Sequence, residues 1–224
     1  MEFIIDTADL AAIKRIVEYF PVTGVTTNPT IIARENTDFK ALLLSIREVI
    51  GDLQLHVQTT ATKAEDIIAE AEALHALLGD PFFIKIPIDA EGLKATKILK
   101  AKGIGVTMTA IFTPQQALMS ALAGAAYVAP YVNRLDNICA DGIDVVQQIV
   151  QIFDTYALNS KVLAASFKNV QQVHSAALCG SHAVTIAPDL YDLLISHPLT
   201  GAAVDGFTAD WKKVYGEATV LDLI

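Results

Sequence analysis

Short apolar and β-branched runs recur along the chain, and longer amphipathic stretches separate them. The short runs predict eight strands, at residues 3–6, 24–27, 53–58, 82–86, 104–109, 126–131, 161–165 and 183–187. The stretches between them predict helices; in residues 9–20, for example, Leu10, Ile13 and Ile16 recur at helical spacing beside charged residues. The chain therefore alternates strand and helix throughout.

This alternation favours a parallel barrel. Eight strands and eight helices within about 200 residues match a (β/α)8 TIM barrel better than an open doubly wound sheet, which is the structural alternative. A chain of 224 residues with 53% hydrophobic content fits one large domain. We expect residues 1–224 to form a single barrel domain, with residues 200–224 as a C-terminal helical extension.

Charge and composition narrow the class of partner. The net charge is −9, with 16 Lys and Arg and no basic run, which predicts no nucleic-acid binding. Residues 103–133 carry no charge, but residues 113–116 interrupt them and leave apolar pieces shorter than the ~20 residues of a membrane span. The first residues lack the pattern of a secretory signal. We expect a cytoplasmic protein that does not enter a membrane.

The metal-binding residue types are scattered. Cys139 and Cys179 lie far apart without a C-x-x-C spacing, so we expect small, reduced core residues. The five histidines form no H-x-x-x-H pair. No metal site is predicted.

Lys85 is the most informative residue, because it lies inside the otherwise apolar run FFIKIP at residues 82–87. Burial disfavours the charged ammonium and lowers the pKa of a lysine, which makes the amine able to attack a carbonyl. This pattern indicates an imine-forming lysine. A structural alternative is a lysine that extends to solvent or pairs with a buried carboxylate.

Polar residues stand at the ends of most predicted strands, where barrel enzymes place their active sites. They are Asp6, Thr26 with Asn28, Gln58, Lys85, Thr109, Tyr131 and Ser166. Each has a local alternative: Asp6 could cap a helix, Asn28-Pro29 is a good turn dipeptide, and Thr109 could simply end a strand. Together they predict one site on one rim of the barrel.

Four motifs carry a resemblance to a known family. They are FIIDTA at residues 3–8, GVTTNPT at 24–30, IKIP at 84–87 and APYVNR at 129–134. In this order and spacing they resemble the small transaldolase family, and within it the fructose-6-phosphate aldolase branch. The resemblance runs from residue 1 to about residue 211.

The resemblance implies a Schiff-base (class I) aldolase without a cofactor or metal, which cleaves fructose 6-phosphate reversibly to dihydroxyacetone and glyceraldehyde 3-phosphate. Lys85 would attack the keto carbon and form the covalent imine. Tyr131 matches the proton-transfer residue, and Gln58 and Thr109 match the positions that hold a water. Asp6 and Asn28, with Thr26 beside them, match residues that bind substrate hydroxyls.

Gln58 and Tyr131 also separate the branches of the family. Transaldolases usually have Glu and Phe at these positions, so this pair resembles the aldolase branch. The alternative is a transaldolase that transfers the dihydroxyacetone unit between sugar phosphates such as sedoheptulose 7-phosphate and glyceraldehyde 3-phosphate, in the pentose phosphate pathway. A sugar-phosphate-binding barrel without catalysis is the alternative from another class.

Cations after the sixth and seventh strands suit the phosphate of a sugar-phosphate substrate. Arg134 and Ser166 match family phosphate ligands, and Lys168 falls where the family often has an arginine. The alternative for Arg134 is a surface ion pair with Asp136 or Asp141.

The end of the chain predicts self-association. Phe207, Trp211 and Tyr215 lie on one face of a helix, and the helix at residues 115–123 carries no charge. The resemblance implies a homo-oligomer, with pentameric rings paired into decamers.

Overall fold

The computed structural model describes residues 1–224, and its eight parallel strands close into a barrel in chain order. The strands are β1 (Glu2–Asp6), β2 (Gly24–Thr26), β3 (Gln54–Gln58), β4 (Phe82–Pro87), β5 (Gly105–Ile111), β6 (Tyr127–Pro130), β7 (Lys161–Ala164) and β8 (Ala183–Ile186). Every predicted strand is present. Because β1 pairs with β8 along Glu2 to Ile5, the sheet has no open edge, and the TIM-barrel prediction is confirmed against the open sheet.

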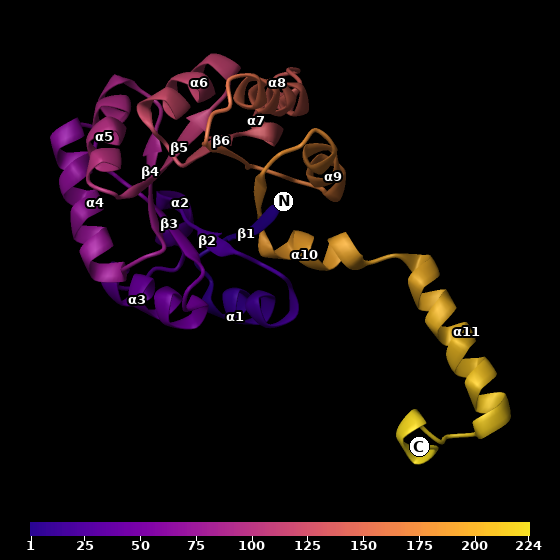
Figure 1. The fold of residues 1–224 in the computed structure, drawn as a ribbon. Helices are drawn as coiled ribbons and strands as arrows, with labels where there is room; N and C mark the ends of the chain where they lie inside the picture. Colours follow the sequence, from indigo (N-terminus) through magenta and orange to yellow (C-terminus); the bar gives the residue numbers. More distant parts are fainter. The chain divides into compact units, whose positions relative to one another are not determined.

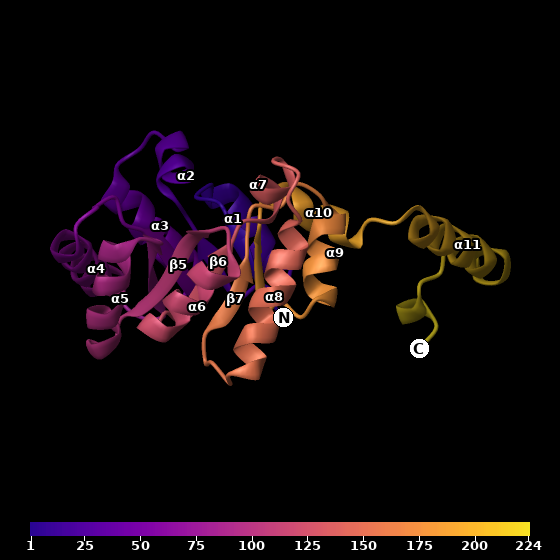
Figure 2. The ribbon, with the colours of Figure 1, turned by 90° about the horizontal axis from the view of Figure 1, so that it is seen from above.

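Helices surround the ring of strands (Figure 1). They are α1 (Leu10–Tyr19), α2 (Pro29–Arg34), α3 (Phe39–Ile50), α4 (Ala64–Leu78), α5 (Ala90–Ala101), α6 (Pro114–Ala123), α7 (Val132–Asp136), α8 (Gly142–Thr155), α9 (Val170–Leu178) and α10 (Pro188–Ile195). Figure 2 shows that the short helices α2 and α7 lie at the same end of the barrel, away from the N-terminus. They extend the rim on which the strands end.

The strand register brings the polar residues at the strand ends to one level. Gln58 is the partner of Lys85 across β3 and β4, and Asp6 is the partner of Thr26 across β1 and β2. Thr109 is the partner of Pro87, two residues beyond Lys85. In a parallel barrel all strands end on the same face, so this register places all these residues on that face.

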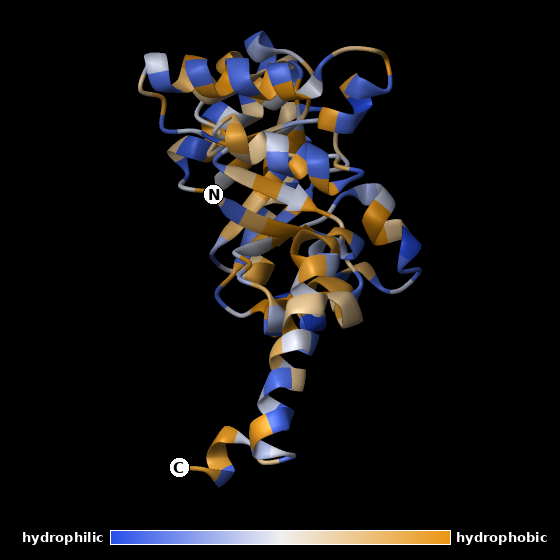
Figure 3. Ribbon diagram, turned by 90° about the vertical axis from the view of Figure 1, so that its right-hand side faces the viewer, coloured by the Kyte–Doolittle hydropathy of each residue, from blue (hydrophilic) through white to orange (hydrophobic).

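Apolar side chains fill both sides of the barrel wall. Inside, at the amino ends of the strands, Ile4, Tyr127 and Leu163 pack together with Phe83 against them. Outside, helices bury one face; α1, for example, buries Ile13 and Ile16. Each such side chain contributes roughly 1.5–3 kcal/mol of transfer free energy. Figure 3 shows orange segments along the barrel strands, whereas blue and orange alternate along the helices.

A polar cluster closes the amino end of the barrel. Glu2 accepts a 2.8 Å hydrogen bond from the Tyr127 hydroxyl and forms an ion pair with Lys161. These partners lower the pKa of Glu2, although its partial burial acts in the opposite direction. Glu2 therefore remains a carboxylate near the floor of the barrel.

The chain divides into two compact units, residues 1–191 and residues 192–224. The second unit contains most of its residues in α11 (Pro198–Tyr215), which buries none of its side chains. Along the predicted stripe, the rings of Trp211 and Tyr215 lie 4.6 Å apart, and Phe207 is 73% exposed. The Trp211 indole donates a 2.7 Å hydrogen bond to the Ala218 carbonyl, which fixes the turn after the helix.

The prediction that the cysteines are core residues is wrong. Both are free thiols, as expected, but Cys139 is exposed and Cys179 only half-buried. Cys139 lies in the exposed turn that follows the end of α7, with φ at 59°. None of the helices is both long and apolar enough to cross a membrane.

Candidate active site

A cavity of about 530 Å³ opens at the carboxyl ends of the strands. Its wall contains all ten residues that the sequence predicted for the site: Asp6, Thr26, Asn28, Gln58, Lys85, Thr109, Tyr131, Arg134, Ser166 and Lys168. Residues from both ends of the barrel sequence thus meet around one space.

Lys85 is buried within this cavity, with 5% of its surface exposed. Its Nζ donates a 2.7 Å hydrogen bond to the Thr27 carbonyl, and it forms no ion pair. Burial lowers the pKa of Lys85, and the nearby Asp6 carboxylate only partly opposes this. The structure therefore contradicts the two structural alternatives, because the amine neither reaches solvent nor pairs with a carboxylate.

Asp6 is held by a directed chain of hydroxyl groups. Thr26 donates its single hydroxyl proton to Asp6 Oδ1 at 2.7 Å. Because that proton is used, the 2.6 Å contact between Thr26 and Thr185 must have Thr185 as the donor. Both threonines are buried, so they fix the carboxylate oxygen while its other oxygen stays available to a ligand.

Asn28 caps a helix and also lines the cavity. Its Oδ1 accepts a 3.0 Å hydrogen bond from the Ile31 amide and caps the N-terminus of α2, with Pro29 at the first helical position. The cap orients the side chain, and its amide Nδ2 has no protein acceptor. The local alternative and the predicted role are therefore compatible, because Nδ2 can donate to a substrate hydroxyl.

Tyr131 and Thr109 form the opposite side of the cavity. Their hydroxyl groups lie 2.9 Å apart. The Tyr131 ring packs edge-on against Phe112 with centroids 5.5 Å apart, and the Arg134 guanidinium carbon lies 4.9 Å from its centroid. Three contacts thus hold the Tyr131 phenol in the lining of the cavity.

Backbone strain marks two positions in this wall. Ala110 and Ser166 have φ values of 58° and 63°, in the left-handed region that non-glycine residues rarely adopt. The β5–β6 register also shifts between Met108 and Ile111, around Thr109. Such strain commonly gathers at functional sites, where it sets the direction of neighbouring side chains.

Arg134 is not engaged by the acidic residues that offered an alternative. Asp136 accepts from the Gly142 amide at 3.0 Å and from Gln172 at 2.6 Å, and Asp141 caps α8 through the Asp144 amide at 2.9 Å. The alternative, a surface ion pair with Asp136 or Asp141, is therefore absent. Arg134 stays on the Tyr131 ring with its donors free for an anion.

Comparison with known proteins decides the family. The sequence profile of the Transaldolase/Fructose-6-phosphate aldolase family matches residues 3–219. The chain belongs to this family.

Relatives cover almost the full length at about two fifths identity. The chain is 42% identical over 222 residues to the "Probable fructose-6-phosphate aldolase" of Streptococcus pneumoniae, covering 98% of this chain and 100% of the relative. It is 41% identical over 213 residues to the "Probable transaldolase" of Desulfosudis oleivorans, covering 95% and 99%. It is 39% identical over 216 residues to the "Probable transaldolase" of Symbiobacterium thermophilum, covering 96% and 99%.

Two residues of this transaldolase/aldolase site escaped the sequence analysis. Arg34, at the end of α2, lines the cavity and has no ion-pair partner. Thr185 is the polar contribution of β8, the one strand for which no residue was predicted. The available signal for Thr185 was the alternation of faces along a strand. Thr185 lies two residues before Ala187, at the end of the predicted strand, so both are on the same face, and both line the cavity.

His56 is the buried histidine of the barrel interior. Its ring stacks on Phe83, and Nδ1 lies 2.8 Å from the Thr107 hydroxyl. Burial, with a smaller contribution from Lys85, lowers the pKa of His56 to about 3. The ring is therefore neutral and adds no positive charge beneath Lys85. No three His, Cys, Asp or Glu side chains lie close enough to hold a metal ion.

Proposed function

We propose that this protein is a Schiff-base aldolase that cleaves fructose 6-phosphate reversibly to dihydroxyacetone and glyceraldehyde 3-phosphate. One observation carries the proposal: Lys85 is buried, lacks an ion-pair partner and faces the same cavity as the paired Tyr131 and Thr109 hydroxyls. This combination gives an amine that can be neutral and a group that can move a proton.

The first step is attack of neutral Lys85 Nζ on the keto carbon. Nζ leaves the Thr27 carbonyl, forms the carbon–nitrogen bond, and the carbonyl oxygen takes a proton to give a carbinolamine. We assign the binding of this adduct's hydroxyls to Asp6, which Thr26 holds, and to the amide of Asn28, which the α2 cap orients. Loss of water then gives a protonated imine, which serves as the electron sink of the reaction.

The second step breaks the bond between C3 and C4. A base removes the proton of the C4 hydroxyl, the bonding electrons move to the iminium nitrogen, and glyceraldehyde 3-phosphate leaves. The enamine that remains on Lys85 takes a proton at C3. We assign this proton transfer to Tyr131, aided by Thr109 and a water near Gln58, and water then releases dihydroxyacetone.

We assign the phosphate of the substrate to the part of the barrel rim that follows β6 and β7. Arg134, Ser166 and Lys168 follow β6 and β7, and Arg134 offers a planar guanidinium fork suited to a phosphate. A substrate with its carbonyl at Lys85 would extend from β4 towards these residues.

Transaldolase activity is the second candidate, and it is favoured by two relatives that are named probable transaldolases. Both reactions share the enamine on Lys85. Protonation of the enamine releases dihydroxyacetone, whereas attack on a sugar-phosphate aldehyde completes a transfer, as in the exchange between sedoheptulose 7-phosphate and glyceraldehyde 3-phosphate. Gln58 and Tyr131 place our proposal on the aldolase side.

We also propose that the protein is a homo-oligomer. Helix α11 buries no side chain, and Leu199, Val204 and Phe207 on it are more than half exposed. Met119 and Leu122 of the uncharged helix α6 are exposed as well. A monomer would leave these surfaces in water, and the family resemblance supports a decamer.

Reduction with borohydride in the presence of dihydroxyacetone tests the proposed chemistry. An imine is trapped as a stable adduct, and mass mapping should locate it on Lys85. Absence of an adduct would instead favour a sugar-phosphate-binding barrel without catalysis. Cleavage of fructose 6-phosphate and transfer to erythrose 4-phosphate, measured side by side, then separates aldolase from transaldolase.

A further inference from the structure

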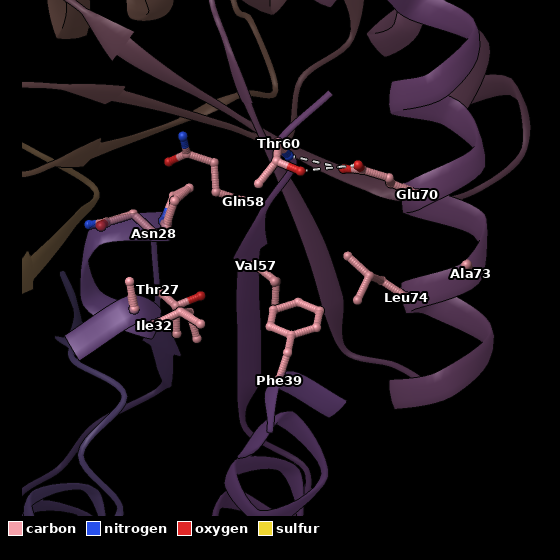
Figure 4. A pocket seen from close by; sticks show the side chains of 12 residues that line it. Thr27, Asn28, Ile32, Phe39, Val57, Gln58, Thr60, Glu70, Ala73 and Leu74 are labelled. Atoms are coloured by element: carbon pink, nitrogen blue, oxygen red, sulfur yellow. Dashed lines mark hydrogen bonds between the residues drawn. The ribbon is translucent and has the colours of Figure 1, made fainter. Parts of the chain in front are cut away.

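A second cavity, of about 420 Å³, lies beside the catalytic one and shares Asn28, Pro29 and Gln58 with it. Figure 4 shows this neighbouring cavity, with Val57 and Leu74 in its apolar wall and Glu70 at its edge. Glu70 belongs to α4 and has no part in the chemistry assigned so far.

Glu70 binds the segment that follows β3. Its carboxylate accepts hydrogen bonds from the Thr59 hydroxyl at 2.5 Å, the Thr60 amide at 3.0 Å and the Thr60 hydroxyl at 3.2 Å. Figure 4 shows the two bonds to Thr60. Although partial burial opposes it, this set of donors lowers the pKa of Glu70. An ionised acceptor makes each of these bonds stronger than a neutral one.

The same segment is attached to the strand of the reactive lysine. The Thr59 amide donates a 3.0 Å hydrogen bond to the Lys85 carbonyl, and Gln58 is the register partner of Lys85. Thr59 is 3% exposed, so its hydroxyl has little access to water and relies on Glu70. Residues 58–60 are therefore held by β4 on one side and by Glu70 on the other.

Gln58 itself makes no hydrogen bond to another side chain. Its place at the catalytic cavity therefore depends on its backbone, which the attachment of residues 59 and 60 fixes. Glu70, on the helix that follows β3, thus anchors the two residues that come directly after Gln58.

We propose that Glu70 is a positioning residue for catalysis, which acts by fixing Gln58 beside the water that serves Tyr131. The inference rests on the proposed function and extends it to the helix outside the barrel wall. A purely structural role would predict that loss of Glu70 changes stability and leaves the Gln58-dependent part of turnover unchanged.

A double-mutant cycle separates these roles. Glu70→Ala should lower kcat for fructose 6-phosphate cleavage roughly 10- to 100-fold, the range expected when a catalytic group is displaced by about 1 Å. KM should change much less than kcat, because the phosphate-binding residues lie on other strands. In a Gln58→Ala background, Glu70→Ala should have almost no further effect on kcat, since its target is already gone.

Matched variants guard against loss of the fold. Glu72→Ala on the same helix removes an exposed ion pair with Lys102 and should leave kcat unchanged. Glu70→Gln keeps one acceptor oxygen and should fall between wild type and Glu70→Ala. If Glu70→Ala does not fold, Thr59→Val removes the 2.5 Å hydrogen bond with little change of volume and enters the same cycle.

The cycle has clear contrary outcomes. Equal losses of kcat from Glu70→Ala in the wild type and in the Gln58→Ala background, or an unchanged kcat in Glu70→Ala alone, would overturn the positioning role. Borohydride trapping at Lys85 is measured in every variant. A missing adduct in the wild type refutes the proposed function, whereas a normal adduct with an additive cycle refutes only the role of Glu70.

Discussion

Removal of the Tyr131 hydroxyl should separate imine formation from product release. Tyr131→Phe keeps the ring, so the contacts with Phe112 at 5.5 Å and Arg134 at 4.9 Å remain. What disappears is the 2.9 Å hydrogen bond between the Tyr131 and Thr109 hydroxyls. One such bond contributes about 0.5–1.5 kcal/mol to stability.

The catalytic loss should be much larger than this stability loss. A general acid–base group contributes about 10²- to 10⁴-fold to a rate, which corresponds to roughly 3–5 kcal/mol of activation free energy. Destabilisation of about 1 kcal/mol lowers the melting temperature of a chain of this size by only about 2–4 °C. Unfolding therefore cannot explain the expected loss of turnover at room temperature.

The assay follows both halves of the reaction in Tyr131→Phe. Borohydride should still trap the adduct on Lys85, while release of dihydroxyacetone from fructose 6-phosphate should stall at the enamine. Adding Gln58→Glu supplies a carboxylate that can activate the water, so the double variant should turn over faster than the single one and favour transfer to erythrose 4-phosphate. Normal cleavage by Tyr131→Phe would refute the reasoning, as would faster transfer than cleavage by the wild type.

Three further changes test other parts of the site, and a fourth tests the floor of the barrel. Lys85→Arg should abolish turnover with an unchanged circular dichroism spectrum, because arginine stays protonated and cannot form the imine; near-wild-type activity would contradict the Schiff base. Because the pKa of Lys85 is lower in the folded state, the stability of the wild type should rise with pH between that folded-state pKa and the unfolded value of 10.5. Lys85→Met should remove this rise, as measured by urea unfolding. Arg134→Ala should weaken the binding of phosphorylated aldehydes by roughly 2–3 kcal/mol and leave the binding of dihydroxyacetone unchanged. An equal loss of binding for unphosphorylated aldehydes would show that Arg134 has a structural role. Glu2 has a lowered pKa, so its contribution is present above 4.5 and lost as pH falls through the folded-state value; Glu2→Gln should flatten this acid limb, and an unchanged limb would show that Glu2 contributes little.

The strand-end residues could be predicted because all strands of a parallel barrel run in the same direction. Once the runs are recognised as parallel strands, their last polar residues must meet on one face, whatever their separation in sequence. Lys85 added a second signal, since a cation within an apolar run has few structural uses. The fold and the strand-end residues of the cavity wall therefore followed from local pattern and topology, whereas Arg134 and Lys168 were predicted from the family resemblance.

Other parts of the site depend on geometry that local pattern does not encode. Arg34 reaches the cavity only because α2 folds over the rim, and Glu70 reaches residues 59 and 60 only through the packing of α4. Ala110 and Ser166 adopt left-handed backbone without the glycine or asparagine that would announce it. Cys139 looked like a small core residue but lies in an exposed turn, because composition does not give the position of a side chain.

In the mechanism we propose, the choice between cleavage and transfer depends on how the enamine on Lys85 obtains a proton. Gln58 lies on the strand next to Lys85, and its amide can hold a water but cannot take a proton from it. Tyr131 lies two strands away on the other side, and its hydroxyl is paired with Thr109 and can both donate and accept. If Tyr131 transfers the proton, water can then hydrolyse the imine and release dihydroxyacetone, the three-carbon product. If a carboxylate replaced Gln58 and a phenylalanine replaced Tyr131, the proton source would move to the other side of the imine, and the enamine would wait longer for an aldehyde acceptor.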